Sequence, residues 1–333
     1  MKTRRTLRLL SVMALGLAAL ISLPAQAKET LRIATLVPKK SSWGKVVRTW
    51  QKAIATKTDG NLELDVYYNG VQGMEDSMVA KMKSGQLDGG LLSSAGLSTI
   101  YRDIMVLQFP GMIRDWATLD RVRKAMDAEL RQHFKAAGFT LLAWSDVGLV
   151  REFSHGFEPR RPSDIKGRHP LVWRNDPITP TLYGTIGAVV PVPLSPGEVL
   201  PALRTGKVDY LLAPAIAAEQ LQWTPYLDYV TNHITTCAIG GTIVRNDRLE
   251  RLPADLRQAL LDLNDKMASA QADLVRKDDV ASFQRLAKST KLVTLTPAEH
   301  AEWQKVMNEA LRRLTQGTFP AASVDRVKKL VSG

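Results

Sequence analysis

Two stretches of this sequence repeat one short pattern, in which a helix, a glycine and a buried strand follow one another directly. The first covers residues 82–92, M-K-S-G-Q-L-D-G-G-L-L, and the second covers residues 198–214, E-V-L-P-A-L-R-T-G-K-V-D-Y-L-L-A-P. Gly85 and Gly206 each end a helix, because glycine is favoured at the position that follows a helix. Pro214 ends the second strand, since proline has no N–H for a sheet ladder. The repeat predicts two similar α/β lobes.

The ends of these two strands are the expected place for a ligand. In open α/β sheets, ligands bind beyond the carboxyl ends of the strands. Ser93-Ser94 follows the first strand and Ala213-Pro214 lies at the end of the second, so both pairs should face one cleft. Upstream, strands and helices alternate over residues 31–92, which indicates a mainly parallel sheet.

The first 27 residues have the features of a secretory signal peptide. Basic residues open the chain and precede an uncharged apolar run over residues 9–23, which is shorter than the ~20 residues of a membrane span. Ala25-Gln26-Ala27 is a small-x-small cleavage signature. We expect cleavage after Ala27, export to the periplasm and a mature protein that spans no membrane, rather than an N-terminal anchor.

Composition argues against several other classes of protein. A hydrophobic fraction of 45% over 333 residues suits a globular chain of two domains. Without the signal peptide, 45 less 4 basic residues stand against 33 acidic ones, a net charge of +8. This charge is either a general aid to solubility or an attraction for anionic ligands or membranes. No motif combines basic and aromatic residues for nucleic acid, so we expect no such partner. Cys237, the single cysteine, lies in an apolar run and is expected to be a buried structural thiol.

The second half of the chain continues the alternation and then becomes helical. Residues 154–169 are polar and rich in Pro and Gly, which is typical of a surface loop between lobes. The apolar run over residues 234–244 predicts a strand that returns from the second lobe to the first. Helical spacing of apolar residues over 256–288 predicts a long helix across one lobe or both. Residues 297–330 predict two more amphipathic helices.

Four blocks of the sequence resemble the solute-binding proteins of tripartite ATP-independent periplasmic (TRAP) transporters. They are Leu31-Arg32-Ile33-Ala34, Gly85-Gln86-Leu87-Asp88, Ser163-Asp164-Ile165-Lys166-Gly167 and the stretch from Glu198 to Asp209. The resemblance covers most of the chain after residue 27. It implies an α/β chain with the two-lobed type II fold of periplasmic binding proteins, a ligand cleft between the lobes, and long C-terminal helices.

The resemblance also implies domain boundaries and partners. Residues 28–148 would form the first part of lobe I and residues 149–238 would form lobe II. Residues 239–333 would supply the return strand, a long bridging helix and C-terminal helices packed mainly on lobe I. The lobes would close on a small-molecule ligand, which in this family is typically an organic acid. The loaded protein would dock on the membrane subunits of a TRAP-type permease, and no cofactor or metal is implied.

The sequence departs from the family pattern where the ligand's charge would be held. In the family, an arginine on the strand after the Asp-x-Lys-Gly block meets the ligand's carboxylate. Here His169-Pro170 resembles a two-residue insertion, so that Val172 takes the arginine's position and Arg174 lies two residues along, on the same strand face. A second family arginine corresponds to either Val150 or Arg151, and a shift of one residue would turn the side chain to the opposite face.

Two other places have apolar residues where the family has polar ones. Leu212-Ala213 stands where the family has an acid-plus-asparagine pair. Leu36-Val37 ends the first strand, where many family members have polar residues. A small dicarboxylate would leave charges unpaired in such a cleft, which is costly. We therefore expect a monocarboxylate or lipid-like ligand with an apolar body. Arg174 is its expected anionic anchor, since a guanidinium can hold a carboxylate at two points.

Further side chains are candidates for the walls of the cleft. The aromatic ones have ordinary core packing as an alternative role. Ser93 and Ser94 would offer hydroxyls or a helix N-terminus to the ligand, or would only cap the helix. The expected wall residues are Leu36, Trp43, Val172, Trp173, Tyr183, Leu212, Ala213 and Trp223.

Two other functions compete with ligand transport. An exported enzyme is not expected, because the five histidines form no metal-protease motif and the chain has no nucleophile-elbow or phosphate-loop pattern. An auxiliary scaffold protein, which handles a lipid-like ligand or none, is the second alternative. The apolar residues of the site would then mean that binding of acids has been lost.

Overall fold

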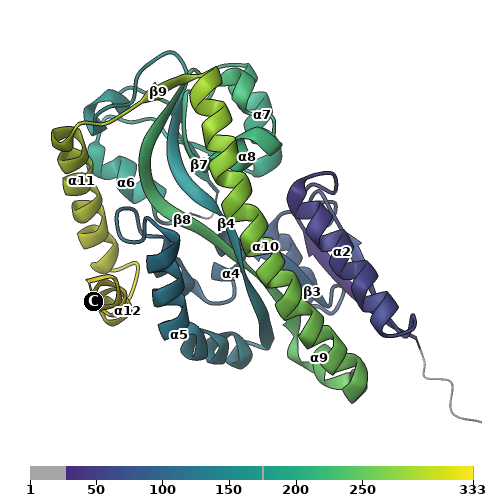
Figure 1. Ribbon diagram of the computed structural model, residues 1–333. Helices are drawn as coiled ribbons and strands as arrows, with labels where there is room; N and C mark the ends of the chain where they lie inside the picture. The colour runs from purple at the N-terminus through teal and green to yellow at the C-terminus, as the bar shows by residue number, and fades with distance from the viewer. Residues whose placement is uncertain (1–27, 175, 333) are drawn as a thin grey trace, which may run out of the picture.

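The computed structural model describes residues 28–174 and 176–332, so the predicted signal peptide and its cleavage site lie outside the described residues. Two α/β lobes are joined by two long strands and one long helix, which runs diagonally across the molecule in Figure 1. This is the two-lobed architecture that the repeated helix–glycine–strand unit predicted.

Lobe I is built on three parallel strands. β1 (Glu29–Thr35) pairs with β2 (Leu62–Tyr67) on one side and with β3 (Gly89–Ser93) on the other. The sheet of lobe I packs against a helix that begins behind Ser41, whose hydroxyl accepts a hydrogen bond from the Gly44 N–H. The helices of lobe I are α2 (Ser42–Lys57), α3 (Glu75–Lys83), α4 (Ser94–Ser98), the 3-10 helix η1 (Arg102–Gln108) and α5 (Trp116–Ala136).

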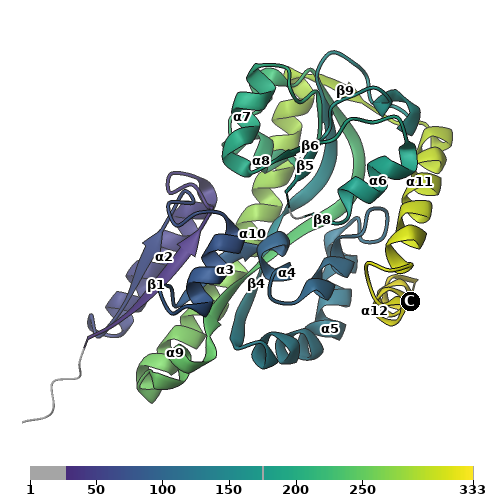
Figure 2. The same cartoon turned by 180° about the vertical axis from the view of Figure 1, so that it is seen from behind.

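Lobe II has its own short parallel pair, which lies beside the main sheet. β5 (Leu171–Trp173) pairs with β6 (Val192–Leu194), and Pro170 forms a single bridge to Tyr210 at the start of β7 (Tyr210–Pro214). Figure 2 shows this pair, and the helices around it, from behind. The helices of lobe II are η2 (Pro162–Ile165), α6 (Thr179–Ile186), α7 (Pro196–Arg204), α8 (Ala215–Gln220) and η3 (Thr224–Tyr226).

The two glycines of the repeated unit have the backbone conformation that is expected just after the end of a helix. Gly85 follows α3 with a φ of 79°, and Gly206 follows α7 with a φ of 67°. Both angles lie in the left-handed region, where a side chain would be strained. The sequence pattern therefore predicted both helix ends correctly.

Two long antiparallel strands cross from one lobe to the other. β4 (Phe139–Ser154) pairs with β8 (Tyr229–Arg245) along most of its length, and the sheet order is β2-β1-β3-β8-β4-β7. The predicted lobe boundaries, after residues 148 and 238, fall inside these strands.

The register of β4 against β8 shifts between Asp146 and Gly148. Gly148 approaches Pro214 so closely that an added Cβ would lie 2.4 Å from the proline Cβ. A bulge of this kind bends a strand, which suits a connection between lobes.

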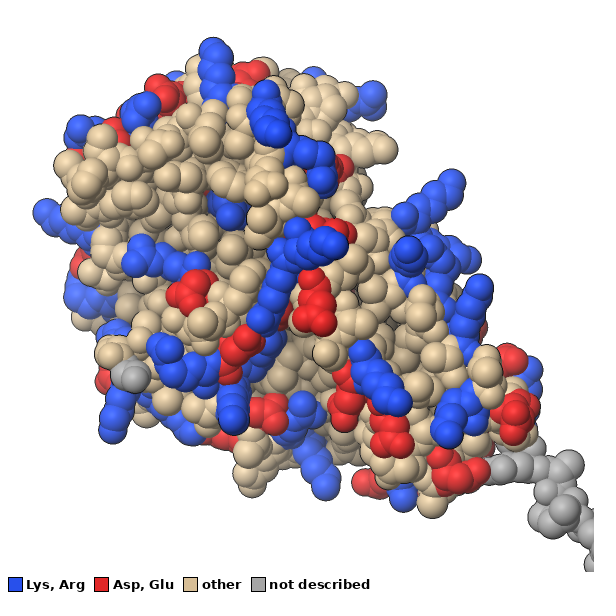
Figure 3. Space-filling model, viewed as in Figure 1, with Lys and Arg blue, Asp and Glu red and all other residues tan. Residues whose placement is uncertain are grey.

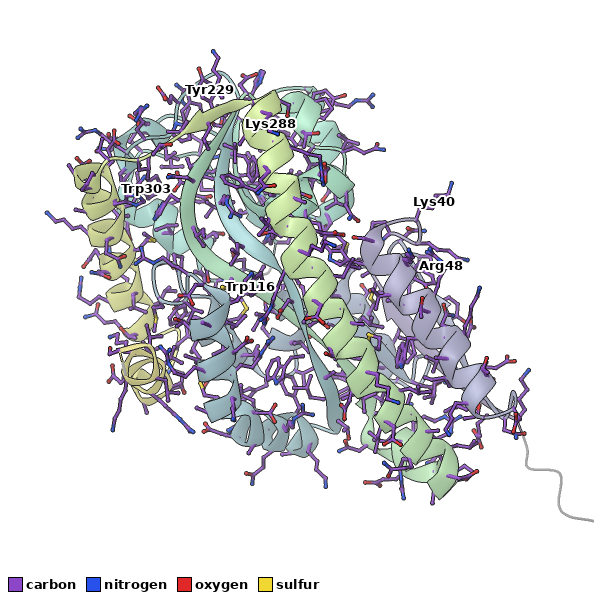
Figure 4. All side chains as sticks on the ribbon, in the orientation of Figure 1. Lys40, Arg48, Trp116, Tyr229, Lys288 and Trp303 are labelled. Carbon is purple, nitrogen blue, oxygen red and sulfur yellow. The ribbon has the colours of Figure 1, made fainter. Side chains whose placement is uncertain are left out.

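The predicted long helix is α10 (Ala254–Ser289), which follows α9 (Asn246–Arg251) and packs against α2, β4 and α8. It therefore contacts both lobes and the strand between them. Arg276 of α10 donates to the buried carboxylate of Asp146 in β4 at 2.7 Å and lies over the ring of Trp116, labelled in Figure 4. Asp279 of α10 accepts hydrogen bonds from the backbone N–H groups of Leu149 and Ile216.

The C-terminal helices differ in part from the expected packing on lobe I. After β9 (Lys291–Val293), α11 (Pro297–Thr315) packs against α6 and η2 of lobe II, whereas α12 (Ala321–Ser332) packs on α5 and η1 of lobe I. The reason is the apolar face of α11. Trp303, which Figure 4 labels, and Met307 join a lobe II core, while Leu314 at the other end joins the lobe I core.

Charged side chains of both signs share the surface, and the single cysteine lies in the interior as expected. Lys and Arg are interspersed with Asp and Glu over the face shown in Figure 3. Cys237 is completely buried, and burial raises the pKa of its thiol to about 12. A protonated, enclosed thiol is a weak nucleophile, which agrees with a structural role.

Candidate ligand-binding site

A cleft of about 410 Å³ lies between the lobes. The carboxyl ends of β1 and β3 line it from lobe I, those of β5, β6 and β7 line it from lobe II, and β4, β8 and α10 complete it. The volume lies within the range of small-molecule sites. Both places singled out in the sequence, Ser93-Ser94 and Ala213-Pro214, belong to the lining.

Most of the expected site residues lie together in this cleft. They come from segments far apart in the sequence, which the two lobes bring together. The expected residues in the lining are Leu36, Trp43, Ser93, Ser94, Trp173, Arg174, Leu212, Ala213 and Trp223.

Arg151 lies elsewhere, although it was a candidate for the cleft. The side chain turns toward α10, where it lies 3.4 Å from the Asp279 carboxylate and 4.2 Å from the centre of the Phe283 ring. Its neighbour Val150 lines the cleft instead. The correction follows from strand alternation, because successive side chains of β4 point to opposite faces.

Val172 and Tyr183 also lie outside the cleft lining. Both pack in a lobe II core with Leu182 and Tyr210. Trp173, the next residue of β5, faces the cleft. Val172 and Arg174 were expected on one strand face, but β5 ends at Trp173, so strict alternation does not extend to Arg174.

Arg174 lies at the cleft already paired with a carboxylate of the protein. Its Nη2 donates to both oxygens of Glu198 at 2.8 Å, and its Nε donates to the Ser195 hydroxyl at 3.2 Å. Its side chain is 55% exposed. The hydrogen bonds from Arg174, followed by those from Ser195, lower the pKa of Glu198 to about 2. The Nη1 group has no hydrogen-bond partner among the described residues and remains available to a ligand.

Ser93 and Ser94 line the cleft, but protein partners occupy the groups that were expected to hold a ligand. The hydroxyl and N–H of Ser93 both donate to the carboxylate of Glu75, at 2.5 and 2.6 Å. The hydroxyl of Ser94 bonds to the side chain of Gln108. Glu75 was missed in the sequence, where the only signal is an acidic residue at the start of a helix.

Two buried polar groups of the lining have no partner among the described residues. They are the indole N–H of Trp223, a residue 1% exposed, and the hydroxyl of Thr236 in β8. An unpaired buried donor costs about 1–3 kcal/mol, so a ligand oxygen that accepts from it gains binding energy. Thr236 was missed because the sequence shows it only as a polar residue inside an apolar strand.

The charges of the lining are mostly negative. Arg174 is the only Lys or Arg among the described lining residues, whereas the acids are Glu75, Asp76, Asp146 and Asp176. Asp146 is neutralised by Arg123 at 2.8 Å and Arg276 at 2.7 Å. Asp176 accepts from the N–H of Ile178 and the hydroxyl of Thr179, and burial raises its pKa.

The lobes touch at the edge of the cleft through Ser42 and Gln220. The Ser42 N–H donates to Gln220 Oε1 at 3.1 Å, and Gln220 Nε2 donates to the Ser42 hydroxyl at 2.5 Å. Ser42 begins α2 in lobe I and Gln220 ends α8 in lobe II. The neighbouring residues Trp43 and Leu221 both line the cleft, so this contact closes one side of it.

A ligand-sized cleft between two α/β lobes that share connecting strands is the architecture of a solute-binding protein. Residues 33–317 match the family described as bacterial extracellular solute-binding protein, family 7, and the chain belongs to this family. This is the family of the TRAP solute-binding proteins, so the resemblance found in the sequence is confirmed. Its members are solute-binding receptors.

Relatives of known description support the assignment. The 2,3-diketo-L-gulonate-binding periplasmic protein of Escherichia coli is 24% identical over 329 residues, which are 94% of this chain and 96% of that protein. A solute-binding protein of Chromohalobacter salexigens is 26% identical over 219 residues, which are 63% of each chain.

Solved structures share the fold. The sugar acid binding protein of Advenella mimigardefordensis, in complex with galactonate, has a TM-score of 0.85 at 16% identity over 92% of this chain and 98% of that one. A Bordetella pertussis receptor that binds pyroglutamic acid has a TM-score of 0.83 at 18% identity, over 91% of this chain and 99% of that one.

Two kinds of feature are absent from the described residues. In residues 28–174 and 176–332, no helix has the length and apolar character needed to cross a membrane. The same residues contain no cluster of three or more His, Cys, Asp or Glu side chains that could hold a metal ion.

Proposed function

We propose that this chain is a periplasmic receptor that captures an organic acid with an apolar body and delivers it to a TRAP-type permease, without catalysing a reaction. The observation that carries the proposal is the composition of the cleft lining. Apolar side chains from both lobes and both connecting strands surround a single Lys or Arg, which is Arg174, among the described lining residues. Such a lining matches a ligand with one carboxylate and a large apolar part.

The carboxylate end of the ligand would bind at lobe II. Arg174 has its Nη1 group free of partners among the described residues, and the buried N–H of Trp223 has no acceptor there. The Trp173 and Trp223 rings lie 6.4 Å apart, centre to centre, which brings Trp223 beside the residue that precedes Arg174. A guanidinium and an indole N–H are both donors to a carboxylate.

The apolar end would extend toward lobe I and the connecting strands. There the lining includes aliphatic and aromatic side chains, among them Leu36 and Val37 at the end of β1 and Trp43 of α2. Relatives are described as binding galactonate or 2,3-diketo-L-gulonate, which are polar acids. We propose that the present chain instead uses its apolar lining to select longer, less polar acids.

A chain-length series tests this function. Purified protein is titrated with straight-chain monocarboxylates of four to fourteen carbons, with galactonate and succinate as polar references, and followed by calorimetry and tryptophan fluorescence. We expect affinity to rise by about 0.8 kcal/mol for each buried methylene until the cleft is filled. Tighter binding of a polar reference than of every alkyl acid would overturn the proposal. So would an absence of binding by the whole series, which would favour the scaffold alternative.

A further inference from the structure

Glu75 is a buried acidic residue of the cleft lining whose partners are hydrogen-bond donors rather than a counter-charge. Glu75 begins α3, lines the cleft from lobe I and is 8% exposed. Among the described residues it forms no ion pair, in contrast to Asp146 of the same lining, which contacts Arg123 and Arg276. An acid kept in such a place costs desolvation energy.

Three hydrogen-bond donors of the protein surround the Glu75 carboxylate. The same arrangement of donors would suit an anion bound from solution. Oε1 accepts from the Ser93 N–H at 2.6 Å, and Oε2 accepts from the Ser93 hydroxyl at 2.5 Å and the Gly96 N–H at 3.0 Å. Gly96 permits the close approach, because an added Cβ would lie 2.9 Å from the Glu75 carboxyl. Burial raises the pKa of Glu75, and the three donors oppose that rise by favouring the ionised form.

The Ser93 donors and the Gly96 N–H at the lobe I side of the cleft are therefore already used. A ligand carboxylate that reached this side would find the Ser93 groups occupied and a like charge beside it. Like charges in a partly dry cleft repel each other, and an unpaired buried carboxylate is costly. A methyl or methylene end would meet the apolar neighbours Met74 and Leu91 instead.

We infer that Glu75 is a specificity-determining residue, which restricts the ligand to one carboxylate by excluding a second one from the lobe I side. The inference rests on the proposed function, in which the first carboxylate binds at Arg174. Removing the charge of Glu75 should therefore allow the second carboxylate of a dicarboxylate to bind at the lobe I side.

The test compares two acids of equal length, decanoate and decanedioate. Calorimetry measures both on wild type, on Glu75→Gln, which keeps the shape of the side chain, and on Glu75→Ala, which vacates the three donors. Asp65→Asn is the control, because Asp65 is an exposed acid of β2 in the same lobe and lies outside the cleft lining. We expect wild type and the control to prefer decanoate at least about tenfold, which corresponds to 1.4 kcal/mol, and both Glu75 variants to lose that preference. An unchanged preference in Glu75→Gln would overturn the inference.

A second measurement separates this inference from the proposed function. Formate is added to Glu75→Ala and to wild type, and the thermal midpoint is recorded. If the Glu75 carboxylate occupies an anion-binding position, formate raises the midpoint of Glu75→Ala more than that of wild type, in a concentration-dependent way. An equal response of the two proteins contradicts the role of Glu75. A wild type that binds neither ten-carbon acid contradicts the proposed function, and the formate response still decides what the Glu75 position binds.

Discussion

The two lobes use the same helix–glycine–strand unit, yet they present opposite electrostatics to one cleft. In lobe I, Glu75 is buried, has no counter-charge among the described residues, and has a raised pKa because of desolvation. In lobe II, Glu198 is exposed, and its bonds to Arg174 lower its pKa to about 2. The comparison teaches that the backbone unit fixes where a cleft forms. We propose that the side chains around the strand ends decide what the cleft accepts.

This contrast suggests that a ligand binds in one direction. In the proposed function the carboxylate end binds at lobe II, where Arg174 and the Trp223 N–H are available. The apolar end would then lie at lobe I, where Leu36 and Trp43 form part of the wall. The following predictions test each side separately.

The largest expected effect comes from removing the cation of lobe II. Arg174→Ala should weaken binding of a long-chain monocarboxylate by about 1.5–3 kcal/mol, because a hydrogen bond to a charged group is lost. Calorimetry measures the change. Arg204→Ala is the control, since Arg204 lies in the same lobe but bonds to Tyr226 outside this cleft. Equal affinities of Arg174→Ala and wild type would show that the anchor lies elsewhere.

Shortening the apolar wall of lobe I should have the next largest effect. Leu36→Ala removes apolar surface and should cost about 1 kcal/mol for a ten-carbon acid, with little change for a four-carbon acid that does not reach the wall. Titration of both acids gives the difference. Leu292→Ala, at an exposed position of β9 outside the lining, serves as control. A loss that is the same for both acids would contradict the proposed direction of binding.

Removing one donor from lobe II should have a smaller effect. Trp223→Phe keeps an aromatic wall but deletes the N–H, and we expect a loss of about 0.5–1.5 kcal/mol in carboxylate affinity. Trp50→Phe is a matched control, because the Trp50 N–H is likewise buried and unpaired among the described residues but lies outside the cleft lining. If both variants bind as wild type does, the Trp223 N–H does not contact the ligand.

The smallest change concerns the pKa of Glu198. Because its pKa is depressed in the folded state, the Glu198 pair stabilises the fold above the ordinary carboxyl range and this contribution disappears as pH falls toward 2. In Arg174→Ala the pKa should rise from about 2 toward the ordinary value of 4.5. Carbon-13 NMR titration of the carboxyl groups measures it. Glu309, whose pKa is about 2 because of Arg312 and Arg313, should not change.

Much of the fold followed from local patterns. Apolar spacing predicted the helix over 256–288, and α10 spans Ala254–Ser289. The apolar run over 234–244 lies within β8, and the glycines after α3 and α7 have the positive φ angles that a helix end favours. These features depend on neighbours in the chain, so a single sequence contains the information that determines them.

Side-chain direction near the cleft was less predictable. Arg151 and Val172 were assigned by matching the sequence to the arginine positions of the family, but β4 has register shifts and β5 ends before Arg174. One residue of error in a strand exchanges the two faces. The packing of α11 was only partly anticipated, because its apolar face contacts cores of both lobes.

The sequence by itself determined that this is a two-lobed α/β solute-binding chain with an unusually apolar set of residues at the strand ends. Only the tertiary structure decided which donors those ends have left for a ligand. Glu75 and Ser93 are 18 residues apart, and Arg174 and Glu198 are 24 residues apart. Hydrogen bonds between such positions depend on how whole elements pack. Residue types and local spacing therefore predict the cleft, and the folded chain determines which of its polar groups are free.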